Sequence, residues 1–262
     1  MEGKTDLYSN PKYYDVAFGW DPVEEIKIFK MIFEKHVPFP VKKILEPACG
    51  TGRFLVSLPP AGYDVVGYDR SGDMVAFARK RISEEGLYQK AIALIGEMQG
   101  ARFADRFDAA INPINSFAYL LSDGDILAHL LSMSVSLKRD SVYIIQITCM
   151  FDNLENSKPS QWKMKKFGIE IETTWRIVDQ IVSSKTCYHH SLLKIDDKGK
   201  ELILEEHHKM RLWTYEDFKR LVKATGKFVL EAIYDEKGNT VSLDSHINGE
   251  MGNLYFVLKN KI

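Results

Sequence analysis

The most informative segment of this chain is Lys43-Ile44-Leu45-Glu46-Pro47-Ala48-Cys49-Gly50-Thr51-Gly52-Arg53-Phe54. It consists of an apolar strand that ends at an acid, then a Gly-x-Gly turn, then the start of a helix. A second predicted strand ends at another acid, Asp69. Doubly wound sheets bind nucleosides at such strand ends, because glycine lets the backbone approach the ligand and the acid accepts hydrogen bonds from both ribose hydroxyls. The segment therefore predicts an α/β fold with a nucleoside site.

The residues around the turn distinguish between kinds of nucleotide. A dinucleotide fingerprint, Gly-x-Gly-x-x-Gly, would have a third glycine where this chain has Leu55. Glu46 precedes the turn, and an anion there would repel a pyrophosphate but could hold a cationic ligand. Both features argue against a nucleotide-dependent oxidoreductase. The plainer alternative is an ordinary strand-to-helix turn, with Asp69 capping the next helix.

Composition excludes several classes of function. The 262 residues include 35 basic and 36 acidic side chains, so no bulk field favours nucleic acid or membrane surfaces. The N-terminal residues lack the apolar core of a signal peptide, and no apolar run approaches the roughly 20 residues of a bilayer span. The three cysteines are odd in number and show no metal-like spacing. We therefore expect no metal, reduced cysteines and a cytoplasmic location.

The first part of the chain alternates between strand and helix patterns, which predicts a parallel sheet covered on both faces. Its predicted strands are residues 44–46, 65–69, 91–95, 107–111 and 141–147, and its predicted helices are 22–36, 54–58, 73–82 and 123–137. Period-two alternation replaces this rhythm from Lys166 to Arg211, and a turn signal at 196–200 suggests three antiparallel strands. A capping box at Thr214 opens another helix, and residues 228–234 and 254–258 close the sheet.

Several motifs then carry a resemblance to a known family. Residues 46–53, Glu-Pro-Ala-Cys-Gly-Thr-Gly-Arg, are followed at the family's spacing by Gly-Tyr-Asp-Arg-Ser-Gly-Asp-Met at 67–74. Residues 106–120 and 211–221 supply further matching blocks. Together they resemble the small-molecule branch of the class I S-adenosylmethionine-dependent methyltransferases. The resemblance implies a Rossmann-like, doubly wound, seven-stranded sheet with its last strand antiparallel, plus an inserted antiparallel sheet. The implied domains are a cofactor-binding core with an N-terminal helical cap at 1–150, an inserted sheet over the acceptor pocket at 151–211, and the end of the core sheet at 212–262.

The resemblance also implies a set of cofactor-binding residues. Glu46, Ala48 and residues 50–52 would line the methionine part of S-adenosylmethionine, and Asp69 would bind the ribose. Arg70 and Met74 would flank the adenine, and the acidic residue of the Glu97-Met98 pair would meet the adenine amine. One of two N-terminal tyrosines would close over the cofactor, although both could instead pack on the core. The full predicted set is Tyr13, Tyr14, Glu46, Ala48, Gly50, Thr51, Gly52, Arg53, Asp69, Arg70, Met74, Glu97, Met98 and Asn112.

Catalytic candidates are fewer, because methyl transfer from a sulfonium depends on proximity, orientation and a dry site. Asn115 and Tyr14 could contact the acceptor, and a turn role for Asn115 is an equal alternative. The doublets at 189–190 and 207–208 lie on predicted strands, where neighbouring side chains point to opposite faces. One histidine of each pair can therefore face a pocket, and His189 and His190 are the candidates from the first doublet.

The sequence thus predicts a methyltransferase that moves a methyl group from S-adenosylmethionine to nitrogen or oxygen of a small-molecule acceptor by in-line displacement, leaving S-adenosylhomocysteine. A non-catalytic module that binds S-adenosylmethionine is the alternative. We expect a small-molecule acceptor as partner, with no nucleic acid and no membrane. The sequence does not choose the acceptor, the oligomeric state, or whether a general base is used.

Overall fold

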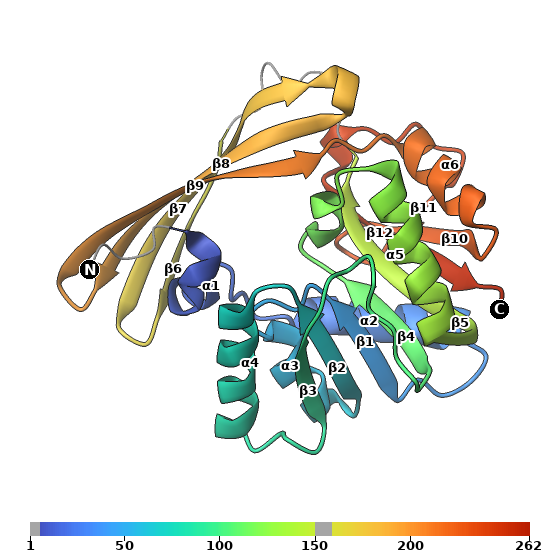
Figure 1. Cartoon of the computed structure of the whole chain (residues 1–262), viewed down its shortest axis with the longest axis horizontal. Coiled ribbons are helices and arrows are strands. Elements are labelled where there is room, and N and C mark those ends of the chain that lie inside the picture. The colour runs from blue at the N-terminus through green and yellow to red at the C-terminus, as the bar shows by residue number, and fades with distance from the viewer. Residues whose placement is uncertain (1–5, 150–158) are drawn as a thin grey trace.

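The computed structural model describes residues 6–149 and 159–262, and its largest element is a mixed sheet (Figure 1). Within these residues the sheet has eight strands in the order β11-β10-β12-β5-β4-β1-β2-β3. They are β1 Lys43–Pro47, β2 Asp64–Asp69, β3 Ala91–Ile95, β4 Phe107–Asn112, β5 Leu137–Thr148, β10 Phe228–Tyr234, β11 Thr240–Val241 and β12 Asn253–Asn260. Strands β1 to β5 pair in parallel, and β12 is antiparallel to both β5 and β10.

This arrangement confirms the doubly wound sheet with an antiparallel last strand. The strand order reverses between β1 and β4, so the ends of these two strands open a crevice of the kind that binds ligands in such sheets. The prediction of seven strands was short by one, because the sheet also includes the edge strand β11. β11 has only two residues, too few to show a period-two pattern.

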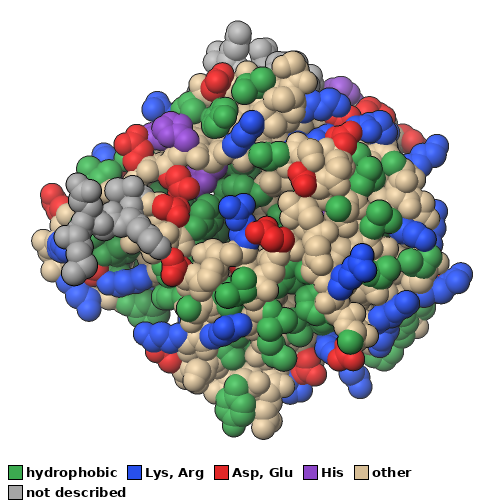
Figure 2. All heavy atoms as spheres, in the orientation of Figure 1, with side chains coloured by type: hydrophobic (Ala, Val, Ile, Leu, Met, Phe, Trp, Pro, Cys, Tyr) green, Lys and Arg blue, Asp and Glu red, His purple; other side chains and the backbone are tan. Residues whose placement is uncertain are grey.

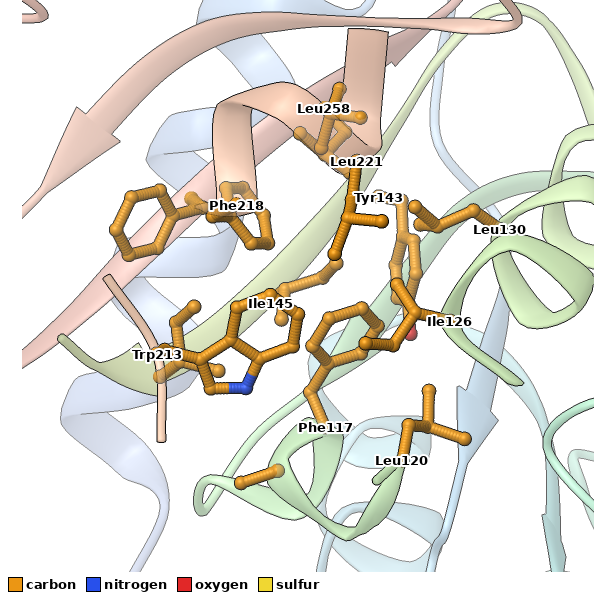
Figure 3. Close-up of a cluster of buried hydrophobic side chains, with 14 of the residues drawn as sticks. Phe117, Leu120, Ile126, Leu130, Tyr143, Ile145, Trp213, Phe218, Leu221 and Leu258 are labelled. Atoms are coloured by element: carbon orange, nitrogen blue, oxygen red, sulfur yellow. The ribbon is translucent and has the colours of Figure 1, made fainter. Parts of the chain in front are cut away.

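Helices cover both faces of the large sheet. On one face lie α2 Val23–His36, α3 Arg53–Ser57 and α4 Gly72–Glu84, which bury their apolar stripes with Ile44, Val65 and Ile144 of the strands. On the other lie α5 Asp123–Ser136 and α6 Tyr215–Thr225. Figure 3 shows this second layer, where Phe218 and Leu221 of α6 meet Phe117, Trp213 and Ile145. No helix within residues 6–149 and 159–262 has the length and apolar character that crossing a membrane requires.

A second sheet follows β5 in the chain. Its four antiparallel strands are β6 Ser160–Lys166, β7 Ile169–Ile181, β8 Thr186–Asp197 and β9 Lys200–Arg211, in that order. The expected three strands are β7, β8 and β9, and β6 is an addition. Lysines in β6 mask its alternating pattern, because Lys163 pairs with Glu170 while Trp162 and Met164 pack inward. The lysine-rich residues 163–166 thus belong to an edge strand. Residues 150–158 lie outside the described residues, and the division into domains at 151 and 211 stays a prediction.

The N-terminal segment joins the two sheets. The short 3-10 helix η1 Leu7–Ser9 and the helix α1 Pro11–Ala17 pack Leu7, Val16 and Phe18 against apolar residues of the second sheet (Figure 1). Buried Asp15 of α1 accepts a hydrogen bond from Arg81 of α4 at 2.6 Å and one from Lys166 of β6 at 3.0 Å. This buried carboxylate therefore ties α1 to the large sheet's helix layer and to the second sheet at once.

Candidate active site

A cavity of about 1310 Å³ lies where the large sheet's strand ends, the N-terminal segment and the second sheet meet. Its floor comes from the residues after β1, β2, β3 and β4, and its roof comes from β7 and β9. Figure 2 shows hydrophobic side chains in the recess between the two sheets, with charged and histidine side chains near it. Such a mix of apolar walls and a few polar groups is typical of small-molecule sites.

The glycine turn after β1 forms one wall of the cavity. Gly50 and Gly52 adopt left-handed backbone conformations with φ of 52° and 77°, and a Cβ on Gly52 would lie 3.0 Å from the Cβ of Ala78. Tyr14 of α1 lies against the turn, with its Cε1 3.7 Å from the position a Gly50 Cβ would occupy. The turn therefore exposes backbone to a ligand, and Tyr14 closes over it.

Asp69 at the end of β2 is held against the same turn. Its two carboxylate oxygens accept hydrogen bonds from the backbone N–H groups of Gly50 and Ser71, each at 2.9 Å. Burial raises the pKa of Asp69, while these two bonds favour its charged form. Each oxygen retains a lone pair, so the carboxylate can still accept hydrogen bonds from a ribose.

Glu46 is the least satisfied polar group near the turn. It is 3% exposed, and its Oε2 has no hydrogen-bond partner among the described residues. Burial raises the pKa of Glu46 to about 8, although Arg53 opposes this. Nearby, Asn112 of β4 donates from Nδ2 to the Pro47 carbonyl at 3.0 Å and leaves its Oδ1 without a partner. A buried, unpaired acid is costly unless a cation arrives, so these residues fit a cationic ligand such as S-adenosylmethionine.

The loop after β3 is anchored by a histidine that the sequence did not single out. His129 of α5 is fully buried; its Nδ1 donates to the Met98 carbonyl and its Nε2 accepts from Tyr143 Oη, both at 2.8 Å. Burial lowers the pKa of His129 to about 4, so the ring is neutral and can make both bonds. It fixes the segment containing Glu97 and Met98, which lines the cavity.

The structure brings most of the predicted site residues to the cavity and places some of them elsewhere. Those that line it are Tyr14, Ala48, Gly50, Arg53, Asp69, Arg70, Glu97, Met98, Asn115 and His189. Glu46, Thr51, Gly52, Met74 and Asn112 are buried and are not part of this lining. Arg53 holds Glu25 through hydrogen bonds of 2.5 and 2.9 Å. Tyr13 turns away and donates to Asp197 at 3.0 Å, so Tyr14 is the tyrosine over the turn.

The histidine doublets separate as strand geometry requires. His189 pairs across strands with His208, and both line the cavity. His190 pairs with His207 on the opposite face, where its Nε2 lies 2.5 Å from Glu205 Oε1; His190 is therefore not a cavity residue. Exposed His207 borders the cavity rim. Burial lowers the pKa of His189 and of His208 to about 4, so both cavity histidines are neutral near pH 7.

Many further cavity residues were absent from the predicted set, among them Tyr8, Tyr119 and Glu206. The hydroxyls of Tyr8 and Tyr119 lie 2.5 Å apart. Two of them carried a weak indication of a site role in the sequence, because Tyr119 belongs to one of the matching sequence blocks and Tyr8 to an aromatic-rich N-terminal segment. Glu206 carried no such indication, because an acid on an alternating strand is ordinary.

Comparison with known proteins agrees with this architecture. Residues 44–140 match the family described as a methyltransferase domain. The dTDP-3-amino-3,6-dideoxy-alpha-D-glucopyranose N,N-dimethyltransferase of Streptomyces fradiae is 24% identical over 79% of this chain and 78% of its own length. The dTDP-3-amino-3,4,6-trideoxy-alpha-D-glucopyranose N,N-dimethyltransferase of Streptomyces venezuelae is 29% identical over 39% of this chain. The match spans about two fifths of that relative's length, 41%.

The likeness in fold extends over nearly the whole chain. The crystal structure of an S-adenosylmethionine-dependent methyltransferase from Clostridium acetobutylicum ATCC 824 has a TM-score of 0.74 at 16% identity, covering 96% of this chain and 97% of that one. The glycine turn and the two strand-end acids, one of which is Glu46 with its unpaired Oε2, lie within the matched region. The chain is similar to S-adenosylmethionine-dependent methyltransferases, in sequence over residues 44–140 and in fold over nearly its whole length.

Proposed function

We propose that the protein transfers a methyl group from S-adenosylmethionine to an amine nitrogen of a small molecule, in the class of amino sugars carried on a nucleotide. The observation that carries this proposal is the roofed cavity, which has the cofactor turn on one side and a separate polar wall on the other. Its volume of about 1310 Å³ exceeds the roughly 300–1,000 Å³ of an ordinary ligand pocket, so it suits a cofactor together with a sizeable acceptor.

The charges around the cavity support a nitrogen acceptor. Among the described residues, acids outnumber bases in its lining, and its two buried histidines are neutral near pH 7. The acids are Asp6, Glu24, Glu25, Asp69, Glu97, Glu206 and Glu236, and the bases are Arg53, Arg70, Arg176 and Lys209. Acidic walls attract an amine in its ammonium form and a sulfonium alike. Relatives that methylate amino groups of dTDP-linked sugars point to the same chemistry.

The chain's own residues would act mainly by positioning. Asp69 would hold the ribose, Glu46 would offset the cofactor's positive charge, and Tyr14 would hold the cofactor against the turn. When bound, S-adenosylmethionine supplies an electrophilic methyl group on a good leaving group. The roof of β7 and β9 would exclude water and orient the acceptor, which suits a displacement between aligned partners.

Turnover tests the proposal. The purified protein should be incubated with methyl-labelled S-adenosylmethionine and, separately, with dTDP-linked amino sugars, the matching deamino sugars, glycine and sarcosine. We expect label only in the amino sugars, with mass spectrometry counting the methyl groups added. Labelling of the deamino sugar would contradict nitrogen as the acceptor, and labelling of glycine alone would contradict a large acceptor. Cofactor binding without turnover on any amine would favour the non-catalytic alternative.

A cytoplasmic location is also a proposal. Cys49, Cys149 and Cys187 are all free and buried, which is usual in reducing compartments. Fractionation of the native host, with the protein detected by antibody, would test it.

A further inference from the structure

One wall of the cavity carries a carboxylate framed by aromatic rings. Tyr14 lies against the turn, and Tyr8 follows it at a centroid distance of 5.7 Å. Beyond Tyr8 lie Tyr119, whose hydroxyl is 2.5 Å from that of Tyr8, and His208, whose ring is 5.7 Å from the Tyr8 ring. Tyr8 therefore lies between Tyr14 and the pair Tyr119 and His208, while its backbone carbonyl accepts a hydrogen bond from Ser71 Oγ at 3.4 Å.

Glu206 of β9 lies in this group and is oriented from two sides. Its Oε2 accepts a hydrogen bond from the Leu7 backbone N–H at 2.8 Å, and its Oε1 is 4.0 Å from His208 Nδ1. The His208 ring stacks on Trp175 at 4.9 Å, and its Nε2 lies 2.9 Å from Ser191 Oγ. The carboxylate is thus held at the cavity wall while 24% of the side chain stays exposed.

Resting on the function proposed above, we propose that Glu206 is the anchoring group for the acceptor's ammonium, with the rings of Tyr8, Tyr119 and Trp175 packing around the cation. An ammonium gains from charge pairing with a carboxylate and from the faces of aromatic rings, and both effects are larger away from bulk water. His208, whose Nδ1 lies 4.0 Å from Glu206 Oε1, is neutral near pH 7 and so does not compete as a cation, whereas Arg70 of the same cavity acts electrostatically on Tyr119.

The same carboxylate has the properties of a proton acceptor. A proton would leave the acceptor's ammonium and bind a Glu206 oxygen, while the nitrogen keeps the electron pair of the broken N–H bond as its nucleophilic lone pair. Burial, with some contribution from Asp6, raises the pKa of Glu206 to about 7, against the opposing hydrogen bond from Leu7. The groups that face it from the packed elements are Asp6, Tyr8, Tyr119 and His208. A carboxyl with such a pKa takes a proton from an amine far more readily than an exposed glutamate does.

Tetramethylammonium is the sharpest probe, because its charge does not change with pH. Its binding to the protein saturated with S-adenosylhomocysteine can be followed by ligand-observed NMR, with uncharged tert-butanol as the matched probe. We expect affinity for tetramethylammonium to rise about tenfold from pH 6 to pH 8, as a carboxyl of pKa about 7 becomes ionised. In Glu206→Gln, which retains an acceptor for Leu7, affinity at pH 8 should fall at least about tenfold and lose its pH dependence.

Glu205→Gln is the control, since Glu205 lies on the opposite face of the same strand with its side chain 58% exposed. It should bind tetramethylammonium as the wild type does, and tert-butanol should bind equally weakly to all three proteins. Equal affinity of wild type and Glu206→Gln, or a pH-independent wild type, would overturn the assignment. The outcome is separate from that of the turnover assay, because a cation site can exist without methyl transfer to any amine tested.

Discussion

Cofactor binding should be linked to a proton at Glu46. The pKa of this buried carboxyl is about 8 without ligand, and a cationic ligand would favour its charged form. We assume that S-adenosylmethionine binds only when Glu46 is ionised. Compared with its affinity for fully ionised protein, its apparent affinity is then about elevenfold lower at pH 7 and about 1.1-fold lower at pH 9. The apparent affinity should therefore rise about tenfold from pH 7 to pH 9.

Glu46→Gln isolates this effect. The substitution keeps the shape and removes the charge, and a charge-assisted interaction is worth about 1.5–3 kcal/mol, so at pH 9 affinity should fall about 10- to 150-fold. At pH 7 the wild type is mostly protonated there, and the ratio of the two affinities should shrink about tenfold. Taking the ratio cancels the ionisation of the ligand's own amino group.

Calorimetry at several pH values, in buffers of different ionisation enthalpy, measures both the affinity and the proton released. Glu34→Gln, an exposed change on α2, should behave as the wild type. A ratio of wild-type to Glu46→Gln affinity that stays constant from pH 7 to pH 9 would refute the reasoning. The stability of the unliganded protein should depend on pH in the opposite direction. Because folding raises the pKa of Glu46, this group's contribution to the free energy of unfolding is full at low pH and is lost as pH rises through about 8. Glu46→Gln should lack this loss.

Other substitutions test the frame of the site. Asp15→Asn should destabilise the fold by about 2–5 kcal/mol in denaturant unfolding, because it removes the buried charge that pairs with Arg81 and Lys166. It should also raise the KM for S-adenosylmethionine several-fold, since it loosens α1, which carries Tyr14. The control Lys12→Met loses only an exposed ion pair and should cost less than about 1 kcal/mol. Gly67→Ala would place its Cβ 2.7 Å from the Cβ of Cys49, so it should cost about 1–3 kcal/mol in thermal unfolding, whereas Gly100→Ala meets no neighbour and should not. Asp69→Ala should weaken S-adenosylhomocysteine binding at least about tenfold by calorimetry.

The grouping of the residues proposed to bind the cofactor could be predicted because these residues are close together in sequence. Glu46, the glycine turn and Asp69 lie within two neighbouring strands, and parallel strands bring their carboxyl ends together at one edge. The surrounding strands and helices could be predicted because their hydrophobic periods are also local in sequence. Two strands were missed: lysines mask the alternating pattern of β6, and β11 has only two residues.

The proposed acceptor wall could not be predicted, because its residues come from distant segments. Tyr8, Tyr119 and Glu206 are separated by about a hundred residues each and share no motif. They meet only because η1 packs on β9, where the Leu7 N–H reaches Glu206. No period or spacing in the sequence encodes such a contact.

Tyr14 shows how the two halves are joined. Neighbouring residues on a helix point about 100° apart, so only one of Tyr13 and Tyr14 can face the turn. Sequence left both open, and the contact between Tyr13 and Asp197 of β8 decides the choice. The Tyr14 ring then lies between the Gly50 turn, where we propose that the cofactor binds, and Tyr8, whose ring centroid is 5.7 Å away. Because Asp15 bonds α1 to the large sheet's helix layer and to β6, we expect a change in the second sheet to reach Tyr14 through α1.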